Sequence, residues 1–166
     1  YYYLEMENCS GGNLGSYIAR NGGIGEENTK KVARGLLDAL TTLNEMNFCH
    51  GDIRLENIVL KRQHKADRKR DIFAEVRLID LDEATKVYSE EVYQNKYSDM
   101  WYYFSPEKFN PTLTGEEMKK ADVWALAIVL LELLHGKHYF EKCSEALFRQ
   151  AISNFSPVFP NASGGF

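Results

Sequence analysis

The sequence predicts an α+β fold that is mainly α-helical, in which helices and short strands surround one central buried helix. The segment Lys119–His135 is apolar on all sides, and a helix without a polar face has to be enclosed by protein. Glu26–Asn47 has the apolar repeat of a long amphipathic helix. Two short runs, Ile58–Leu60 and Ala74–Ile79, are typical of paired strands. We therefore expect helices packed on one buried helix, with short β-hairpins beside them.

The N-terminal part of the chain contains a strand and a short helix ahead of the long amphipathic helix. Tyr1–Glu7 is aromatic and alternating, which predicts a strand. Asn13–Arg20 is a short helix candidate, and Asn21-Gly22-Gly23 ends it. In Glu26–Asn47, two glutamates in the first turn suit the helix dipole. The apolar positions at helical spacing in this segment are Val32, Leu36, Leu40 and Leu43.

Loops alternate with helices in the rest of the chain. Lys61–Arg70 is basic and is interpreted as a solvated hairpin loop, with a nuclear-import or nucleic-acid patch as the alternative. Ala84–Tyr103 is polar without a clear period, which predicts a long loop. The central helix Lys119–His135 is expected to end at Gly136, and Ser144–Ser153 forms a last short helix.

Length and composition restrict the class of protein. With 166 residues the chain can bury one sizeable core or form one lobe of a larger unit. A net charge of −4 weakly opposes nucleic acid as a partner. The longest apolar run is shorter than the ~20 residues of a membrane span, so none is expected. Three cysteines at wide spacing favour neither a zinc site nor a disulfide framework, and we expect an intracellular, cytoplasmic protein.

One polar loop, Cys49–Leu60, carries the chemistry around which the chain is organised. It holds a carboxylate (Asp52), a cation (Arg54) and a carboxamide (Asn57) within six residues, directly before a predicted strand. The carboxylate can accept a proton, the cation can neutralise a phosphate, and the amide oxygen can bind a metal ion. These groups favour transfer chemistry. The alternative is that Asp52 and Asn57 are turn residues that only cap the loop.

Five stretches, in order and in register, resemble the eukaryotic protein kinase family. Residues 4–14 are similar to its hinge, and His50–Asn57 resembles the catalytic loop H-R-D-L-K-x-x-N. Asp80-Leu81-Asp82 occupies the D-F-G place and Ser105-Pro106-Glu107 the A-P-E place. Ala121–Leu126 looks like the family's buried helix. The resemblance covers nearly the whole chain and implies the large C-terminal lobe of a kinase.

The resemblance implies ATP and Mg²⁺ as cofactors and a protein as substrate. Asp52 would orient the substrate hydroxyl and accept its proton, and Arg54 would contact the transferred phosphate. Asn57 and Asp80 would bind Mg²⁺, which prefers oxygen ligands. The residues implied to border the adenine are Met6, Glu7, Cys9, Leu14 and Val59.

Three departures from the family pattern bear on activity. Gly51 replaces an arginine that pairs with a phosphate on the activation loop, so control through that contact should be absent. Asp82 replaces the glycine of D-F-G, and a residue with a Cβ restricts that backbone. Met100 stands where Ser/Thr kinases carry a threonine that bonds the catalytic carboxylate. Tyr103 does match the family's tyrosine.

Several other residues have more than one interpretation. Asp122 would cap the central helix, brace the catalytic loop, or do both. His50 is expected to pack against Leu81, which keeps the apolar character of the phenylalanine it replaces. His135 and His138 lack a third ligand, so no metal is expected there. The phosphorylation candidates on the long loop are Tyr88, Ser89, Tyr93, Tyr97 and Ser98.

Three functions remain open at this stage. The first is an active protein kinase, and Arg54 two residues after Asp52 fits the Ser/Thr class. The second is a pseudokinase, a binding or scaffolding module, which the three departures favour. The third is a small-molecule kinase resembling the aminoglycoside phosphotransferases, to which His-Gly-Asp and Leu78–Asp82 are locally similar.

Residues 1–166 are expected to form a partial kinase domain with the hinge and most of the C-lobe, and without the N-lobe. The chain contains no Gly-rich phosphate loop, strand lysine or partner glutamate. It opens inside a predicted strand and closes in a Pro/Gly/Ser-rich loop, 156–166. We therefore expect a fragment that does not transfer phosphate alone.

Overall fold

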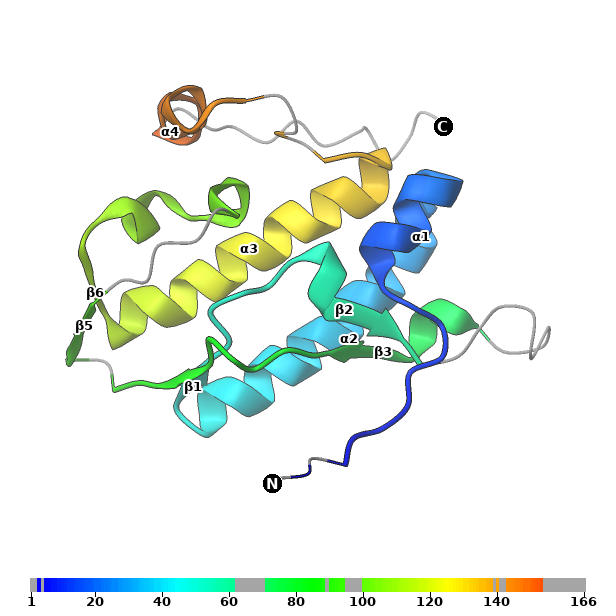
Figure 1. Ribbon diagram of the computed structural model, residues 1–166, viewed down its shortest axis with the longest axis horizontal. Helices are drawn as coiled ribbons and strands as arrows, with labels where there is room; N and C mark the ends of the chain where they lie inside the picture. The colour runs from blue at the N-terminus through cyan, green and yellow to red at the C-terminus, as the bar shows by residue number, and fades with distance from the viewer. Residues whose placement is uncertain are drawn as a thin grey trace.

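The structure is a computed structural model that describes residues 3, 5–61, 71–88, 90–94, 100–138, 140 and 143–153. Within these residues it consists of four α-helices and three two-stranded antiparallel sheets. Figure 1 shows α3 (Gly115–His135, yellow) crossing the centre, with α2 (Gly25–Glu45, cyan) on one side and α4 (Glu145–Ser153, orange) on the other. The predicted mainly helical α+β architecture with a central helix is confirmed.

The two N-terminal helices form as predicted. In α1 (Leu14–Asn21) the Asn13 side chain accepts a hydrogen bond from the Ser16 amide at 2.7 Å and so begins the helix. The long helix α2 presents one apolar face, and it packs against α3 and the strand β3. The residues buried on that face are Thr29, Val32, Leu36 and Leu40.

The central helix α3 begins four residues earlier than predicted, at Gly115 rather than Lys119. Thr114 and Glu117 form a capping box: the Thr114 hydroxyl accepts from the Glu117 amide, and the Glu117 carboxylate accepts from the Thr114 amide. The helix ends at Gly136, as predicted. Val123 is 53% exposed, so the predicted enclosure on all sides is wrong for the N-terminal half of the helix.

A short hairpin lies against α1 and α2. β2 (Ile58–Leu60) pairs antiparallel with β3 (Val76–Leu78), and Ile58 faces Leu78. The second strand is shorter than the predicted Ala74–Ile79, because Asp71 caps a 3₁₀ turn, η2 (Ile72–Ala74), by accepting from the Phe73 amide at 3.0 Å. The predicted basic loop 61–70 lies outside the described residues except for Lys61.

The predicted N-terminal strand is wrong for the residues that the structure describes. Residue 3 and residues 5–9 form no strand pairing. The chain joins the hairpin only later, where the Gly11 amide donates to the Leu60 carbonyl at 3.0 Å and the Leu60 amide donates to the Gly12 carbonyl at 2.9 Å. Because β2 already pairs with β3 and with this stretch, it offers no edge to the residues before it.

The predicted loop 84–103 contains regular elements, so its interpretation as a plain loop is wrong. Each short strand pairs with a segment elsewhere in the chain: β4 with β1 and β5 with β6. Residues 89 and 95–99 lie outside the described part. The elements within this stretch are β4 (Thr85–Lys86), β5 (Val92–Gln94) and the 3₁₀ turn η3 (Trp101–Tyr103). Their partner strands outside it are β1 (Phe48–Cys49) and β6 (Thr112–Thr114).

The helix α4 confirms the last predicted element. Its Phe148 is fully buried and packs edge-on against Phe140 with ring centroids 4.7 Å apart. Trp101 of η3 and Phe109 of the 3₁₀ turn η4 (Pro106–Phe109) contact the same ring. This aromatic cluster fixes the segment that follows the long loop. None of the helices in the described residues has the length and apolar character needed to cross a membrane.

Candidate active site

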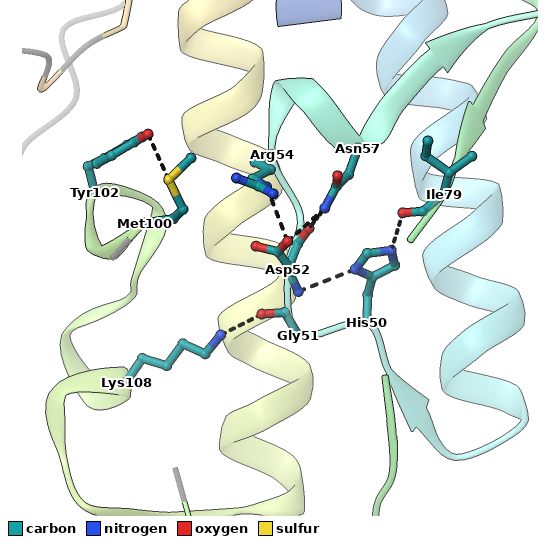
Figure 2. A network of polar contacts seen from close by, with 9 residues as sticks. All are labelled: His50, Gly51, Asp52, Arg54, Asn57, Ile79, Met100, Tyr102 and Lys108. Atoms are coloured by element: carbon teal, nitrogen blue, oxygen red, sulfur yellow. Dashed lines mark hydrogen bonds and ion pairs between the residues drawn. The ribbon is translucent and has the colours of Figure 1, made fainter. Parts of the chain in front are cut away.

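The loop between β1 and β2 brings its three polar residues into contact. The Asn57 side-chain amide donates to the backbone carbonyl of Asp52 at 2.9 Å and to its carboxylate at 2.7 Å. Arg54 Nε lies 3.1 Å from the same carboxylate, as an ion pair without the alignment of a hydrogen bond. Figure 2 shows Arg54 and Asn57 converging on Asp52. Asp52 is thereby held from two sides and remains partly exposed.

The helix α3 holds the backbone of this loop through one buried carboxylate. Asp122 accepts from the His50 amide at 2.6 Å and from the Gly51 amide at 2.9 Å. Burial raises the pKa of Asp122, and the two amide bonds oppose that shift. Asp122 therefore braces the loop, as one interpretation predicted. The other interpretation, capping of the helix, is wrong, because Thr114 is the cap.

The ring of His50 links the loop to the segment that carries Asp80. Burial lowers the pKa of His50, so the ring is neutral, with one nitrogen donating and the other accepting. Its Nδ1 lies 3.3 Å from the Asp52 amide and accepts from it, so its Nε2 carries the hydrogen and donates to the Ile79 carbonyl at 3.2 Å. These two hydrogen bonds fix the ring, and Leu81, against which the ring was predicted to pack, is 57% exposed.

Two oxygen donors suited to Mg²⁺ lie on adjoining segments. The Ile79 amide donates to the Asn57 carbonyl at 2.9 Å, which brings Asp80 beside the end of the loop between β1 and β2. Asp80 is exposed and adopts a left-handed backbone with φ of 67°, and within the described residues its carboxylate has no hydrogen-bond or ion-pair partner. The Asn57 amide nitrogen is engaged by Asp52, which leaves its oxygen as the available ligand atom. Both groups fit a hard cation.

The residues predicted to border the adenine differ in accessibility. Met6 is 76% exposed, and Cys9 is partly exposed. Leu14 is fully buried and Val59 is 8% exposed, at the point where Asn13 bridges to Val59. The structure thus brings Leu14 and Val59 together beneath the predicted hinge. Leu14 has no accessible surface with which to contact a ligand in this structure.

The side chain of Glu7 is engaged by the hairpin. Its carboxylate pairs with Lys61 at 2.7 Å and with Arg77 at 2.8 Å. The hydrogen bonds from these two cations hold the pKa of Glu7 below its ordinary value. Arg77 is therefore committed to the hinge segment.

At the other side of the loop, Met100 and Tyr103 have different surroundings. The Tyr102 hydroxyl donates to the Met100 sulfur at 3.1 Å. The Tyr103 hydroxyl donates to the buried carboxylate of Glu132 at 2.7 Å, and burial raises the pKa of Tyr103 well above its ordinary value. His138 Nδ1 lies 2.9 Å from the other oxygen of Glu132. These contacts anchor η3 to α3.

Sequence reasoning missed Lys108. Its ammonium donates to the Gly51 carbonyl at 2.6 Å, directly before Asp52 (Figure 2). The only sequence signal is that it immediately follows Ser105-Pro106-Glu107. Lys108 lines a cavity of about 440 Å³ together with the carboxylates of Asp52, Asp80, Asp82, Glu83 and Asp122.

The protein kinase domain model matches residues 1–161. The chain belongs to the protein kinase family. The kinase domain is 27% identical over 161 residues to serine/threonine-protein kinase 33 from Bos taurus, with 96% of this chain and 32% of that protein covered. It is 26% identical over 160 residues to serine/threonine-protein kinase ppk25 from Schizosaccharomyces pombe, which covers 96% of this chain and 35% of that protein. It is 26% identical over 162 residues to serine/threonine-protein kinase cds1 of the same yeast, which covers 95% of this chain and 33% of that protein. The chain thus spans about a third of the length of these relatives.

Proposed function

We propose that this chain is the hinge and most of the C-lobe of a protein kinase that transfers the γ-phosphoryl group of ATP to a serine or threonine hydroxyl. The observation that carries the proposal is the contact of the Asp52 carboxylate with Asn57 and Arg54, next to the segment of Asp80. The names of the relatives, which are serine/threonine-protein kinases, support the same class. The N-lobe, ATP and a protein substrate complete the proposed unit.

In this proposal each loop residue has a distinct task. The substrate hydroxyl donates its proton to Asp52 as its oxygen bonds to the γ-phosphorus, the bond from that phosphorus to the β,γ-bridging oxygen breaks, and ADP leaves. Arg54 neutralises charge on the transferred group. Asn57 and Asp80 would hold Mg²⁺, which would neutralise charge on the phosphate oxygens.

The proposed nucleotide site extends to the hinge. The carbonyl of Glu7 and the amide of Cys9 would bond the adenine edge, with Met6 at its border and Val59 beneath it. The fully buried Leu14 would support this floor without contacting the nucleotide. The Glu7 side chain does not compete for this task, because its carboxylate is engaged by Lys61 and Arg77 on the hairpin. An intracellular setting is part of the proposal, since the cysteines, all three in described positions, form no disulfide.

A pseudokinase is the second candidate, and Met100 is the observation that favours it. A thioether cannot donate a hydrogen bond to Asp52 as the family's threonine does, and the Met100 sulfur is engaged by Tyr102. A pseudokinase would bind a nucleotide or a partner without efficient transfer. The same experiment separates the two candidates.

The test uses the full-length protein with the variants Asp80→Asn and Asp52→Asn. Asp80→Asn should abolish Mg²⁺-dependent nucleotide binding, because it removes the charge of the main ligand. Asp52→Asn should spare binding and lower the rate of phosphoryl transfer. Asp38→Asn, an exposed carboxylate on α2, is the matched control and should match the wild type. Transfer that survives both site substitutions would refute the assigned roles, and binding without transfer in the wild type would support the pseudokinase.

A further inference from the structure

Lys108 connects the segment after the long loop to the catalytic loop. It lies in η4, between the aromatic cluster around Phe148 and the residue before Asp52. Its ammonium lies 4.6 Å from the centre of the Phe104 ring and donates to the Gly51 carbonyl at 2.6 Å. A cation on an aromatic face and a charge-assisted hydrogen bond together fix the direction of this side chain.

The peptide groups that Lys108 contacts are those that set the direction of Asp52. Gly51 has φ of 85°, a conformation that glycine adopts easily and can also leave easily. Asp122 accepts from the Gly51 amide, and Lys108 donates to the Gly51 carbonyl. Both backbone polar groups of Gly51 are therefore bound, by two elements that are separate in the sequence. Loss of the Lys108 bond would remove the shorter of the two hydrogen bonds on the peptide before Asp52, whose amide also donates to His50 Nδ1 at 3.3 Å, and so would loosen that peptide.

The charges around Lys108 are those of the site itself. Burial lowers the pKa of Lys108, and the carboxylates of Asp122, Asp52 and Glu83 oppose that shift. Among the described residues that line the 440 Å³ cavity, Lys108 is the one lysine or arginine. The positive charge of the Lys108 ammonium reduces the repulsion between the carboxylates that line the cavity.

We propose that Lys108 is a positioning residue for phosphoryl transfer that supplies, from within the domain, the cation that Gly51 does not provide. In the family pattern an arginine at position 51 is aligned by a phosphate on the activation loop. Here the bond from Lys108 to the Gly51 carbonyl aligns Asp52 without a phosphate. This inference rests on the proposed kinase function.

The experiment measures kinetics of the full-length protein with Lys108→Met, Lys108→Arg and Lys108→Gln. For Lys108→Met, kcat should fall by roughly 10- to 100-fold, since a displacement of about 1 Å at a reacting group can cost 10²-fold, while KM for ATP stays within about twofold. Lys108→Arg should recover most of kcat, because it keeps the charge and the donor. Lys108→Gln keeps a donor without the charge and replaces the Met variant if that does not fold. Lys30→Met, which removes an exposed lysine paired with Glu26 on α2, is the control.

Three outcomes overturn the inference while the proposed function stands: unchanged kcat in Lys108→Met, an equal change in kcat and KM, or no recovery in Lys108→Arg. If the wild type transfers no phosphate, the proposed function fails. Amide hydrogen exchange of residues 50–52 then decides whether Lys108 holds the loop, which is the part of the inference that does not need transfer. Faster exchange in Lys108→Met than in Lys30→Met supports the bond to Gly51, and equal exchange overturns it.

Discussion

Restoring the family's arginine with Gly51→Arg should destabilise the domain instead of creating a phosphate-controlled switch. A side chain at Gly51 would take the left-handed backbone of φ 85°, which costs an L-residue about 1–2 kcal/mol. Its Cβ would also lie 2.9 Å from the Glu83 carbonyl oxygen, a backbone atom that cannot simply rotate away. Overpacking of this kind costs about 1–3 kcal/mol. The two costs sum to about 2–5 kcal/mol, and a less flexible unfolded chain offsets ~0.4–1 kcal/mol of this, so the free energy of unfolding should fall by about 1–5 kcal/mol.

A pair of alanine variants separates the two causes. Gly12 has φ of 75°, and a Cβ there would meet no atom within 4 Å, so Gly12→Ala carries the strain of a positive φ without a clash. Both alanine variants gain the same ~0.4–1 kcal/mol from a less flexible unfolded chain, which cancels in the comparison. Gly51→Ala should thus be less stable than Gly12→Ala by about 1–3 kcal/mol. Urea unfolding of the full-length variants measures this difference.

The activity of the same variant completes the test. Phosphatase-treated and loop-phosphorylated samples of wild type should turn over at similar rates, and Gly51→Arg should not separate them. The explanation would be refuted if Gly51→Arg were as stable as wild type and gained ~100-fold, about 2.7 kcal/mol of barrier, on phosphorylation. Arg77 on β3 is paired with Glu7, so it is not expected to serve as an alternative phosphate partner.

Three further predictions concern carboxylates that accept hydrogen bonds, two of them buried and one exposed. Asp122→Asn should lower the free energy of unfolding by about 1–3 kcal/mol and reduce kcat, because one of the two amides it accepts from loses its acceptor; urea unfolding showing no loss would contradict this. Tyr103→Phe removes a donor to the buried carboxylate of Glu132 and should cost a similar ~1–3 kcal/mol in the same assay, and a stability equal to wild type would show that the bond is dispensable. Hydrogen bonds from Lys31 and a backbone amide lower the pKa of Asp71, so its ionised form stabilises the fold above the unfolded-state pKa, and this contribution is lost as the pH falls through the lowered value. The free energy of unfolding of the wild type should exceed that of Asp71→Asn by at most ~1 kcal/mol at neutral pH, and this difference should narrow below about pH 4. A difference that widens with acid would refute the stabilising role of the ionised Asp71.

The helices were predictable because each carries its own periodic signal. α2 buries side chains at regular spacing, and α3 is rich enough in apolar residues to need a central place. The strands β4 and β5 were not predictable, since they contain two and three residues and pair with distant segments. Tyr1–Glu7 shows the opposite failure: a strand-like pattern in a stretch whose described residues have no pairing partner.

The candidate site divides in the same way. The grouping of Asp52, Arg54 and Asn57 follows from a spacing of a few residues, so the sequence alone predicted it. The contact of Lys108 with Gly51 could not be predicted, because 57 positions separate the two residues and a single lysine beside a motif has no distinctive pattern. The exposure of Leu81 could not be deduced either, because an apolar residue type does not say whether any element covers it.

The carboxylate of Asp122 also sets the order in which the domain can mature. It binds an amide 72 positions earlier in the chain, so the catalytic loop lacks its support until synthesis has passed residue 122 and α3 has docked on the earlier elements. Closing so long a span of chain lowers its conformational entropy before the contacts that offset this loss have formed. We therefore expect the loop between β1 and β2 to become protected from proteolysis late in folding, together with α3. A nascent chain that ends before this helix would carry the loop residues Asp52, Arg54 and Asn57 without the Asp122 brace.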